Sequence, residues 1–232
     1  MISNISSGKK SLSETAYDWL RDSIIYLRFE PGQMVYENEL AQTLGMSRTP
    51  LREAFRMLLM EGMIEILPQR GVRVSLISRS KAEEVRFIRE SLEVSAVREV
   101  CRLWKEDGIR FSKIAKSVDA LLEEQHQAAE ERDALAFLQA DEAFHQLILR
   151  QFGNETLLSV VLLMRGHLNR LRYLMLKEFE QMDVLIDEHR KLFEAVATGD
   201  EQAAVSQLES HLRKLHVELP EAVAKFPHYF TK

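Results

Sequence analysis

The sequence contains little cysteine, glycine or proline, and each shortage excludes a class of structure. Its single cysteine, Cys101, excludes an intrachain disulfide and a cysteine-based zinc site. Only 9 Gly and 5 Pro among 232 residues favour long helices over short strands and turns. No apolar run approaches the about 18 residues of a membrane span, and no signal-peptide pattern opens the chain. We therefore expect a mainly helical, cytoplasmic protein without a membrane partner.

Charge and hydrophobic pattern divide the chain at one place. Residues 1–78 hold nine Lys/Arg and nine Asp/Glu, and the remaining 22 and 27 lie in 79–232, so the net charge of −5 belongs to the second part. The hydrophobic periodicity also changes around residues 77 to 80. We expect a flexible tail over 1–10, one domain over 11–78 and a second over 79–232.

The first domain has the pattern of three helices followed by a hairpin. Apolar spacing predicts a helix from Leu12 that stops before Pro31, a short helix over 37–44, and a third that ends at Gly62. Residues 64–67 and 72–75 have strand character and are joined by a turn over 68–71 that contains glycine. These elements predict a compact domain of three helices and a two-stranded wing.

The third helix carries side chains suited to DNA. It follows a short turn at Gly45, and Arg48 and Arg52 lie one turn apart beside its apolar stripe, with Arg56 one turn further. Ser47 suits the N-cap, where helix N–H groups can face a phosphate. The planar fork of arginine can grip guanine or phosphate with two bonds.

The hairpin strengthens the DNA interpretation. Arg70, at its tip beside Gly71, can reach a phosphate or the minor groove from the flank. The alternative is a solvated surface helix whose arginines pair with Glu53, which is the more frequent role of spaced arginines. The combination of helix and hairpin favours DNA binding.

Amphipathic helical periodicity runs through the whole second domain. It predicts six helices, over about 79–106, 111–131, 133–150, 154–177, 180–198 and 200–218. Glycines at 108, 153 and 199 break the pattern and leave only short connections. Neighbouring helices should therefore fold back on one another in one antiparallel all-helical bundle.

Three of these helices place ligand-type side chains among inward apolar positions. Asp141 and His145 share one inward face, His189 lies on another and His211 on a third. Burying one carboxylate and three imidazoles is costly unless they are paired, and one divalent cation satisfies all four. A single inward histidine is more often a hydrogen-bonded core residue, but four converging groups favour a metal. Such ligands suit Zn or Ni, with Mn or Fe as alternatives.

An arginine also lies within the inward face of the helix over 79–106. Arg89 either pairs with Glu93 one turn on or receives an anion. His167 also falls on an inward face, where it is either a fifth member of the metal group or an ordinary core residue, and Arg172 follows on the same helix. A metal with open positions beside an arginine forms a receptor for a carboxylate, so we expect a small organic acid to contact Arg89, together with His167 and Arg172.

Residues 11–75 resemble the winged helix-turn-helix of the GntR family of bacterial regulators. The similarity runs through Phe29-Glu30-Pro31-Gly32, Glu39-Leu40-Ala41, Leu44 to Ala54, Glu61-Gly62-Met63-Ile64 and Arg70 to Val74. The resemblance implies operator contacts from Ser47, Arg48, Thr49 and Arg52 and from the wing at Gly71. Asn38 stands where the family often has an arginine, which implies an altered contact.

Residues from about 79 to 230 resemble the FCD effector domain of the FadR branch of that family, in its VanR-like six-helix type. The similarity rests on Arg89 to Glu93, Asp141 to His145, Glu188-His189 and His211-Leu212. It implies metal binding by Asp141, His145, His189 and His211, and homodimers that read a pseudo-palindrome.

These features together predict a transcription regulator, a repressor and not an enzyme, that binds operator DNA as a homodimer. A small carboxylate bound near the metal would control its operator affinity. Two alternatives remain open. One is a metal-dependent enzyme, for which the sequence offers no general-base motif such as His-Glu-x-x-His. The other is a DNA-binding protein with a purely structural metal.

Overall fold

The computed structural model describes residues 10–179 and 181–231, apart from the side chains of 108–112. The described residues fall into two compact units. The N-terminal unit takes those of Met1–Ile77 and His228–Lys232, and the helical unit is Ser78–Pro227. The tail expected over 1–10 lies, except for Lys10, outside the described residues.

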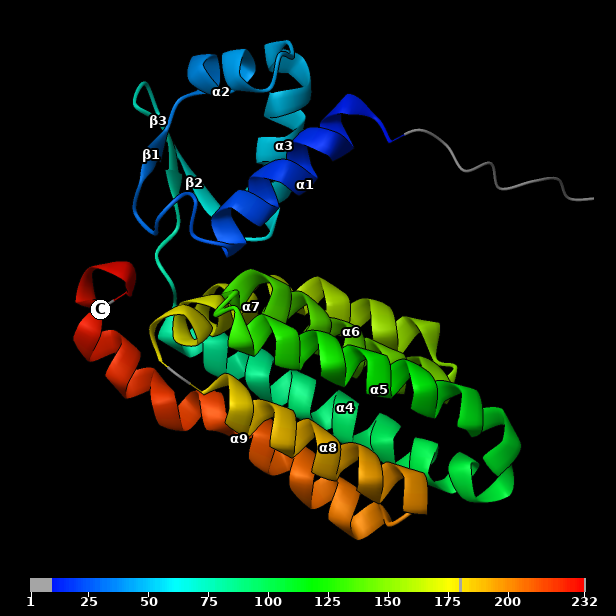
Figure 1. The fold of residues 1–232 in the computed structure, drawn as a ribbon. Coiled ribbons are helices and arrows are strands. Elements are labelled where there is room, and N and C mark those ends of the chain that lie inside the picture. The colour runs from blue at the N-terminus through cyan, green and yellow to red at the C-terminus, as the bar shows by residue number, and fades with distance from the viewer. Residues whose placement is uncertain (1–9, 180, 232) are drawn as a thin grey trace, which may run out of the picture. The chain divides into compact units, whose positions relative to one another are not determined.

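The N-terminal unit consists of three helices and a small antiparallel sheet (Figure 1). In chain order its elements are α1 (Leu12–Ile25), β1 (Met34–Val35), α2 (Glu37–Thr43), α3 (Arg48–Met60), β2 (Ile64–Leu67) and β3 (Gly71–Val74). The strand order is β1-β3-β2, so β3 is central. β1 extends the predicted two-stranded wing to three strands, because Val35 pairs with Val72. Two residues are too few to produce an alternating pattern, which is why the sequence does not predict β1.

The core of the N-terminal unit fixes the orientation of α3. Leu51, Ala54, Phe55 and Leu58 are buried against α1 and the sheet. α1 begins with a capping box, in which Ser11 and Glu14 each bond the other's backbone amide. With its apolar side held in this core, α3 presents the opposite side, including Arg48 and Arg52, to solvent.

The end of the chain returns to the N-terminal unit. The Ile77 amide donates to the Tyr229 carbonyl at 2.8 Å, and the Thr231 amide donates to the Ile77 carbonyl at 3.0 Å. Ile77 and Phe230 form a parallel bridge, and both are buried. The expected second domain ran from 79 to 232 and so included these last residues, which the structure groups with the N-terminal unit. The sequence does not predict this grouping, because the last residues have no helical pattern that would assign them to either unit.

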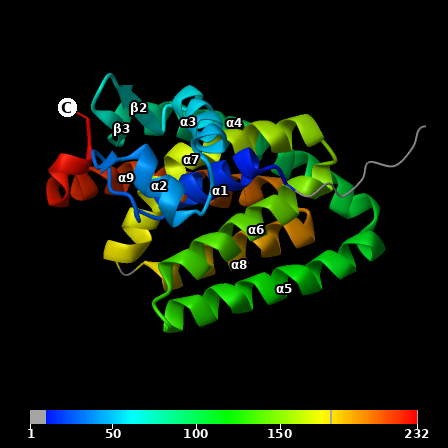
Figure 2. The ribbon, with the colours of Figure 1, turned by 90° about the horizontal axis from the view of Figure 1, so that it is seen from above.

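The helical unit contains the six helices that the sequence predicts. They are α4 (Arg79–Glu106), α5 (Gly108–Glu130), α6 (Ala134–Phe152), α7 (Glu155–Glu178), α8 (Met182–Thr198) and α9 (Glu201–Lys225), followed by the 3₁₀ turn η1 (Pro227–Tyr229). α4 packs against α6, α7, α8 and α9, and α5 packs against α6 and α8. Figure 2 shows α5, α6 and α8 side by side. The mainly α fold with an antiparallel bundle is therefore confirmed.

Local sequence signals set most helix boundaries in the bundle. Asp133, Asn154 and Asp200 cap α6, α7 and α9 through their side chains. Gly153 and Gly199 end α6 and α8 in the left-handed conformation, with φ of 76° and 66°. These caps produce the short connections that bring neighbouring helices together.

The main exception is the end of α9, which continues to Lys225, whereas the sequence predicts an end near residue 218. Pro220 lies inside the helix and removes one backbone donor, the partner of the carbonyl four residues earlier. Both Pro220 and His216 are exposed, so water can replace that donor.

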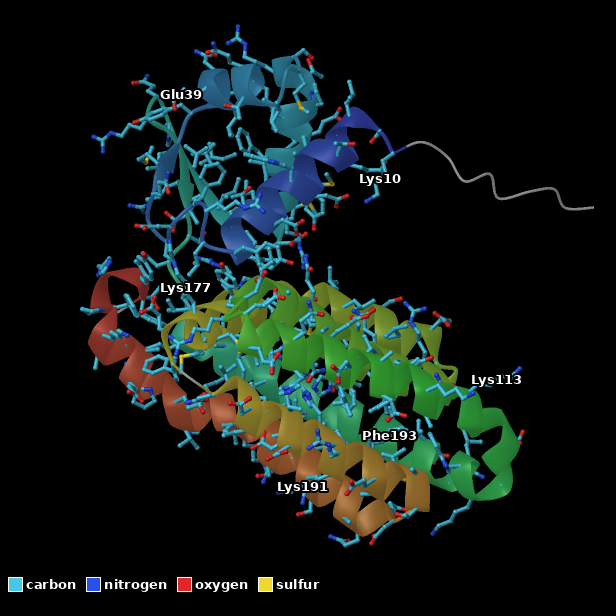
Figure 3. All side chains as sticks on the ribbon, viewed as in Figure 1. Lys10, Glu39, Lys113, Lys177, Lys191 and Phe193 are labelled. Carbon is cyan, nitrogen blue, oxygen red and sulfur yellow. The ribbon has the colours of Figure 1, made fainter. Side chains whose placement is uncertain are left out.

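The outside of the bundle carries many charged side chains. Figure 3 shows Lys113 and Lys191 on its surface, and both are exposed. None of the described helices combines the length and the apolar character needed to cross a membrane.

Candidate DNA-reading surface and metal centre

The start of α3 has no side-chain cap among the described residues. Ser47 precedes the helix in an extended conformation, with φ −72° and ψ 167°, and its hydroxyl caps no amide of the described helix. The first backbone N–H groups of α3 therefore lack a side-chain cap. They give the helix start a partial positive charge that suits a phosphate.

Arg48 and Arg52, which we call the reading arginines, lie on the exposed side of α3. Their side chains are 61% and 62% exposed. Glu37 of α2 holds both: Arg52 Nε donates to its two carboxylate oxygens at 2.9 and 3.1 Å, and Arg48 Nε lies 3.7 Å from Oε1. The alternative interpretation of α3 named Glu53 as the partner of these arginines, but Glu53 accepts a hydrogen bond from Ser13 instead. Glu37 thus groups the two guanidinium groups on the solvent side of α2 and α3.

The other predicted DNA contacts belong to the same unit. Asn38, Thr49 and Arg70 are exposed, and Gly71 is half-buried. Gly71 has a φ of +110°, and a Cβ there would lie 3.3 Å from the Tyr36 ring, so the turn into β3 needs glycine. Glycine at this position therefore allows the wing to turn close beside β1.

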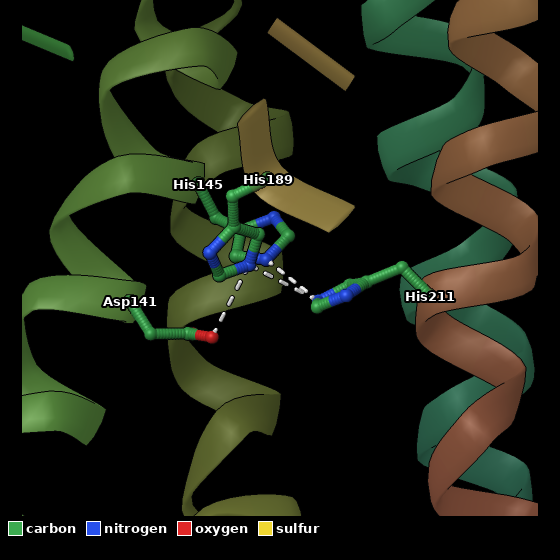
Figure 4. Close-up of side chains that lie close together, drawn as sticks. All are labelled: Asp141, His145, His189 and His211. Atoms are coloured by element: carbon green, nitrogen blue, oxygen red, sulfur yellow. Dashed lines mark hydrogen bonds and ion pairs between the residues drawn. The ribbon is translucent and has the colours of Figure 1, made fainter. Parts of the chain in front are cut away.

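The four predicted metal ligands come together inside the helical unit (Figure 4). Asp141 and His145 project from α6, and His189 and His211 from α8 and α9. All four are buried, with at most 8% of any residue exposed. One ligand atom from each lies within 4.8 Å of the others. Positions spread over 71 residues of sequence therefore form one buried group.

The spacing of these atoms matches that of ligands around a single ion. His145 Nε2 lies 3.2 Å from His211 Nε2, His189 Nε2 lies 3.4 Å from the same atom, and His189 Nε2 lies 3.4 Å from Asp141 Oδ1. Ligands about 2.0–2.2 Å from a shared zinc-type ion are separated from one another by about 3–3.5 Å. The group therefore has the right size for a first-row divalent metal.

Each imidazole is oriented by an acceptor at its other nitrogen. The Nδ1 contacts are His145 to Glu93 Oε2 at 3.2 Å, His189 to Gln125 Oε1 at 2.7 Å and His211 to Glu188 Oε2 at 2.9 Å. An acceptor at Nδ1 favours the tautomer with its proton there, which turns the Nε2 lone pair toward the centre. Three inward lone pairs repel one another unless a cation lies between them.

The charge state of the group also suits a cation. Burial alone would raise the pKa of Asp141, but the charge of the neighbouring Arg172 foremost opposes it, and that pKa is held well below its usual value. Burial lowers the pKa of His145 to about 4, against the opposing effect of Glu93. Burial, followed by the neighbouring His211, lowers the pKa of His189 well below its usual value. A carboxylate with neutral imidazoles is the state that binds metal ions.

One oxygen of Asp141 accepts no hydrogen bond within the described part of the chain. Arg172 donates to Asp141 Oδ2, whereas Asp141 Oδ1 accepts no hydrogen bond from the described residues. A fully buried carboxylate oxygen without a partner is costly. Because Oδ1 faces the imidazoles, the residues present fit a bound cation.

Two of the three predicted effector residues line a pocket beside this group. The pocket encloses about 620 Å³ of empty space, part of it open to solvent, and its lining includes Arg89, Arg172 and His211. Arg89 Nε donates to Glu93 at 2.5 Å, which is the pairing given above as one of the two alternatives for Arg89. Two other guanidinium nitrogens, Arg89 Nη2 and Arg172 Nη1, have no acceptor among the described residues. His167 is half-buried and does not belong to that lining.

Three buried polar residues of this region were not predicted. Gln125, the acceptor for His189, lies on the inward side of α5, three residues after the buried Leu122. Arg165 and Asn169 are buried on α7. A polar residue at an inward position of a predicted helix is the signal that could have identified each of them.

Comparison with known proteins identifies the class of the chain. The family model for the FCD domain matches residues 84–214, and the model for bacterial regulatory proteins of the gntR family matches residues 12–74. The chain therefore belongs to the GntR family of bacterial regulators, in the branch that carries an FCD domain, as the sequence motifs predict.

Individual relatives agree with this assignment. The chain is 31% identical to an HTH-type transcriptional regulator of an unstable DNA locus in Streptomyces ambofaciens, over 91% of this chain and 86% of that protein. It is 26% identical to the HTH-type transcriptional repressor RspR of Escherichia coli K12, over 88% and 87%. The solved structure of E. coli McbR/YncC matches the fold with a TM-score of 0.78 at 20% identity, over 92% of this chain and 99% of that one. The protein is thus a DNA-binding transcription regulator and not an enzyme, so the enzyme alternative is wrong.

Proposed function

We propose that the protein is a repressor whose affinity for operator DNA depends on an organic acid bound beside a divalent metal in the helical unit. The observation that carries the proposal is the buried Asp141 and three-histidine group with a pocket directly at His211. Repression is supported by the relative RspR, which is named a repressor. Such a regulator would act in the cytoplasm, where bacterial DNA lies.

The proposed DNA contacts come from α3, α2 and the wing. The reading arginines are grouped on the exposed side of α3 and can reach guanine edges or phosphates. Ser47 and Thr49 lie at the uncapped helix start, where a phosphate is favoured. Asn38 offers an amide from α2, and Arg70 with Gly71 offers the wing tip to the flanking backbone.

A homodimer would place two recognition helices on a pseudo-palindrome. Half-sites would then be about one helical turn apart, roughly 34–36 Å. Exposed apolar side chains support self-association: Phe87 on α4 and Val160 and Leu163 on α7 are 65%, 37% and 67% exposed, and α4 packs against α7. In solution, Leu163→Glu should shift the dimer toward monomer, and Val184→Glu, on exposed α8 surface, should leave it unchanged.

Asp141, His145, His189 and His211 would hold the metal, and the bound ion would supply a point of attachment for a carboxylate. Zn and Ni suit this nitrogen-rich set best, with Mn and Fe as alternatives. Arg89 and Arg172 each retain a buried donor at the pocket, which suits the same carboxylate. His167, outside the pocket lining, would act indirectly if it takes part.

The second candidate is a purely structural metal. Four protein ligands complete the tetrahedral shell that zinc prefers, whereas a metal that prefers six ligands retains two positions for an acid. The pocket at His211 favours the regulatory role. Ligand-insensitive operator binding by the metal-loaded protein would favour the structural one.

Selection of genomic fragments by the purified protein tests the DNA-binding half of the proposal. We expect enrichment of fragments with two inverted half-sites, and loss of that enrichment when both reading arginines are replaced by alanine. Arg190→Ala, an exposed substitution on α8, is the matched control. Equal enrichment by the doubly substituted protein would refute the assigned recognition helix.

Elemental analysis of the protein as purified tests the metal half. We expect close to one equivalent of Zn, Ni, Mn or Fe per chain, and a large loss of metal in His211→Gln. His126→Gln, on the exposed surface of α5, should retain full occupancy. Full metal content in His211→Gln would refute the assigned site.

A further inference from the structure

The lining of the pocket beside the candidate metal centre combines cations with apolar side chains. Arg89, Arg172 and His211 lie close to the candidate ligands, because Arg172 bonds Asp141 and Arg89 bonds Glu93, which contacts His145. The rest of the lining contains four polar residues, Arg86, Gln181, Lys214 and Glu218, and six apolar ones, Leu168, Met175, Leu176, Leu185, Leu212 and Leu215. A pocket that combines a few charged groups with an apolar wall is typical of sites for small molecules.

Arg89 and Arg172 can together bind one more acidic group. Arg89 and Arg172 each already pair with one carboxylate, and each keeps one buried nitrogen without an acceptor among the described residues, Nη2 and Nη1 respectively. Two such donors match the two oxygens of a single carboxylate.

The other cations of the lining are already paired with acidic side chains. Lys214 donates to Glu188 at 2.7 Å, and Arg86 donates to Glu83 at 3.2 Å. A second acidic group on the ligand would have to compete for these cations. The charges of the pocket therefore favour a ligand with one carboxylate.

The six apolar side chains of the lining offer no hydrogen bonds to a polar ligand. Leu168, Met175, Leu176 and Leu212 are buried, and Leu185 and Leu215 are half-buried. Hydroxyl groups held against these side chains would lose their hydrogen bonds to water without replacement. A hydrocarbon tail would instead cover the two half-buried leucines.

We propose that the effector of this regulator is a monocarboxylic acid with an apolar tail of several carbons. Its head lies at Arg89, Arg172 and His211, and its tail lies along the leucines of α8 and α9. The proposal rests on the function proposed above, since it assigns the chemical class of acid that the same pocket takes. It excludes sugar acids and dicarboxylic acids as the preferred effectors.

Calorimetric titration of the metal-loaded full-length protein with acids of increasing chain length tests the proposal. The series is acetate, butanoate, hexanoate and octanoate, with succinate and gluconate for comparison. Each buried methylene should tighten binding about fourfold, so hexanoate, with four more carbons, should bind roughly 250-fold more tightly than acetate. Tighter binding of succinate or gluconate than of hexanoate would overturn the proposal and leave the proposed function intact. If none of the six acids bound, both would fail.

A pair of variants on α9 locates the tail. Leu215→Asn removes part of the apolar lining, whereas Val217→Asn changes an exposed residue outside it. We expect Leu215→Asn to bind acetate like the unchanged protein but to lose at least tenfold of the gain from acetate to hexanoate. Val217→Asn should retain the full gain. An unchanged gain in Leu215→Asn would refute the assigned tail site.

Discussion

Removing the metal should lower the melting temperature of the helical unit. Without a cation, three Nε2 lone pairs and Asp141 Oδ1, which accepts no hydrogen bond from the described residues, remain within 4.8 Å of one another in a buried site. Their mutual repulsion then favours opening of α6, α8 and α9. The perturbation is chelation of the purified protein, followed by return of one divalent metal at a time.

The magnitude follows from binding linkage and the size of the unit. A metal present at about 100 times its dissociation constant stabilises the folded state by about 2.7 kcal/mol. The helical unit spans Ser78–Pro227, which is 150 residues. For a domain of about that size 1 kcal/mol shifts the melting temperature by about 2–4 °C. Chelation should therefore lower it by about 5–11 °C.

The two tryptophans allow the helical unit to be followed by itself. Trp19 packs on Phe29 in the N-terminal unit, and Trp104 of α4 packs edge-on against Phe193 of α8 with ring centroids 5.5 Å apart. In a Trp19→Phe background the remaining tryptophan fluorescence reports unfolding of the helical unit. The melt is recorded with metal and with chelator.

Two further substitutions in that background separate metal loss from general destabilisation. His189→Gln removes one ligand, so its melting temperature should not respond to chelator. His126→Gln changes an exposed histidine and should retain the full response. No shift in the Trp19→Phe protein, or an undiminished shift in His189→Gln, would refute the assigned metal site.

Three other predictions concern the N-terminal unit. Asn38→Arg should tighten operator binding at low salt and steepen the slope of log K against log salt by about 0.9, because it adds one phosphate contact; an unchanged slope would count against a DNA contact from α2. Glu37→Gln should raise non-specific DNA affinity by about twofold to fivefold, because it releases the arginines from exposed ion pairs worth up to about 1 kcal/mol. Fluorescence anisotropy measures this affinity, and weaker binding would mean that the carboxylate is needed to position the reading arginines. Phe230→Ala should destabilise this unit by about 3–5 kcal/mol in denaturant unfolding followed by Trp19, whereas the exposed His228→Ala should change it by less than about 0.5 kcal/mol; equal effects would contradict the packing of the chain end.

Much of the fold follows from local sequence patterns. α3 and the six bundle helices have apolar residues at helical spacing and clear breaks, so their existence follows from periodicity alone. β1 is too short to show a pattern. The end of α9 is misjudged because Pro220 normally stops a helix, and only its exposed position in the fold makes it tolerable.

Only part of the candidate site could likewise be predicted from the sequence. The inward positions of Asp141, His145, His189 and His211 follow from helix periodicity, and their convergence follows from an antiparallel bundle. Pairings between helices depend on tertiary packing that local patterns do not encode. That is why the alternative interpretation of α3 named Glu53, whereas the acidic partner of the reading arginines is Glu37.

Operator affinity of one protein preparation in three states tests the central claim most directly. The states are metal-loaded, metal-loaded with the tightest-binding acid of the series, and chelated, each titrated against the selected operator at fixed salt. We predict that the acid weakens operator binding by about 5-fold to 150-fold, a typical range for allosteric coupling, and that operator weakens acid binding by the same factor. Superimposable operator curves in all three states would contradict the account.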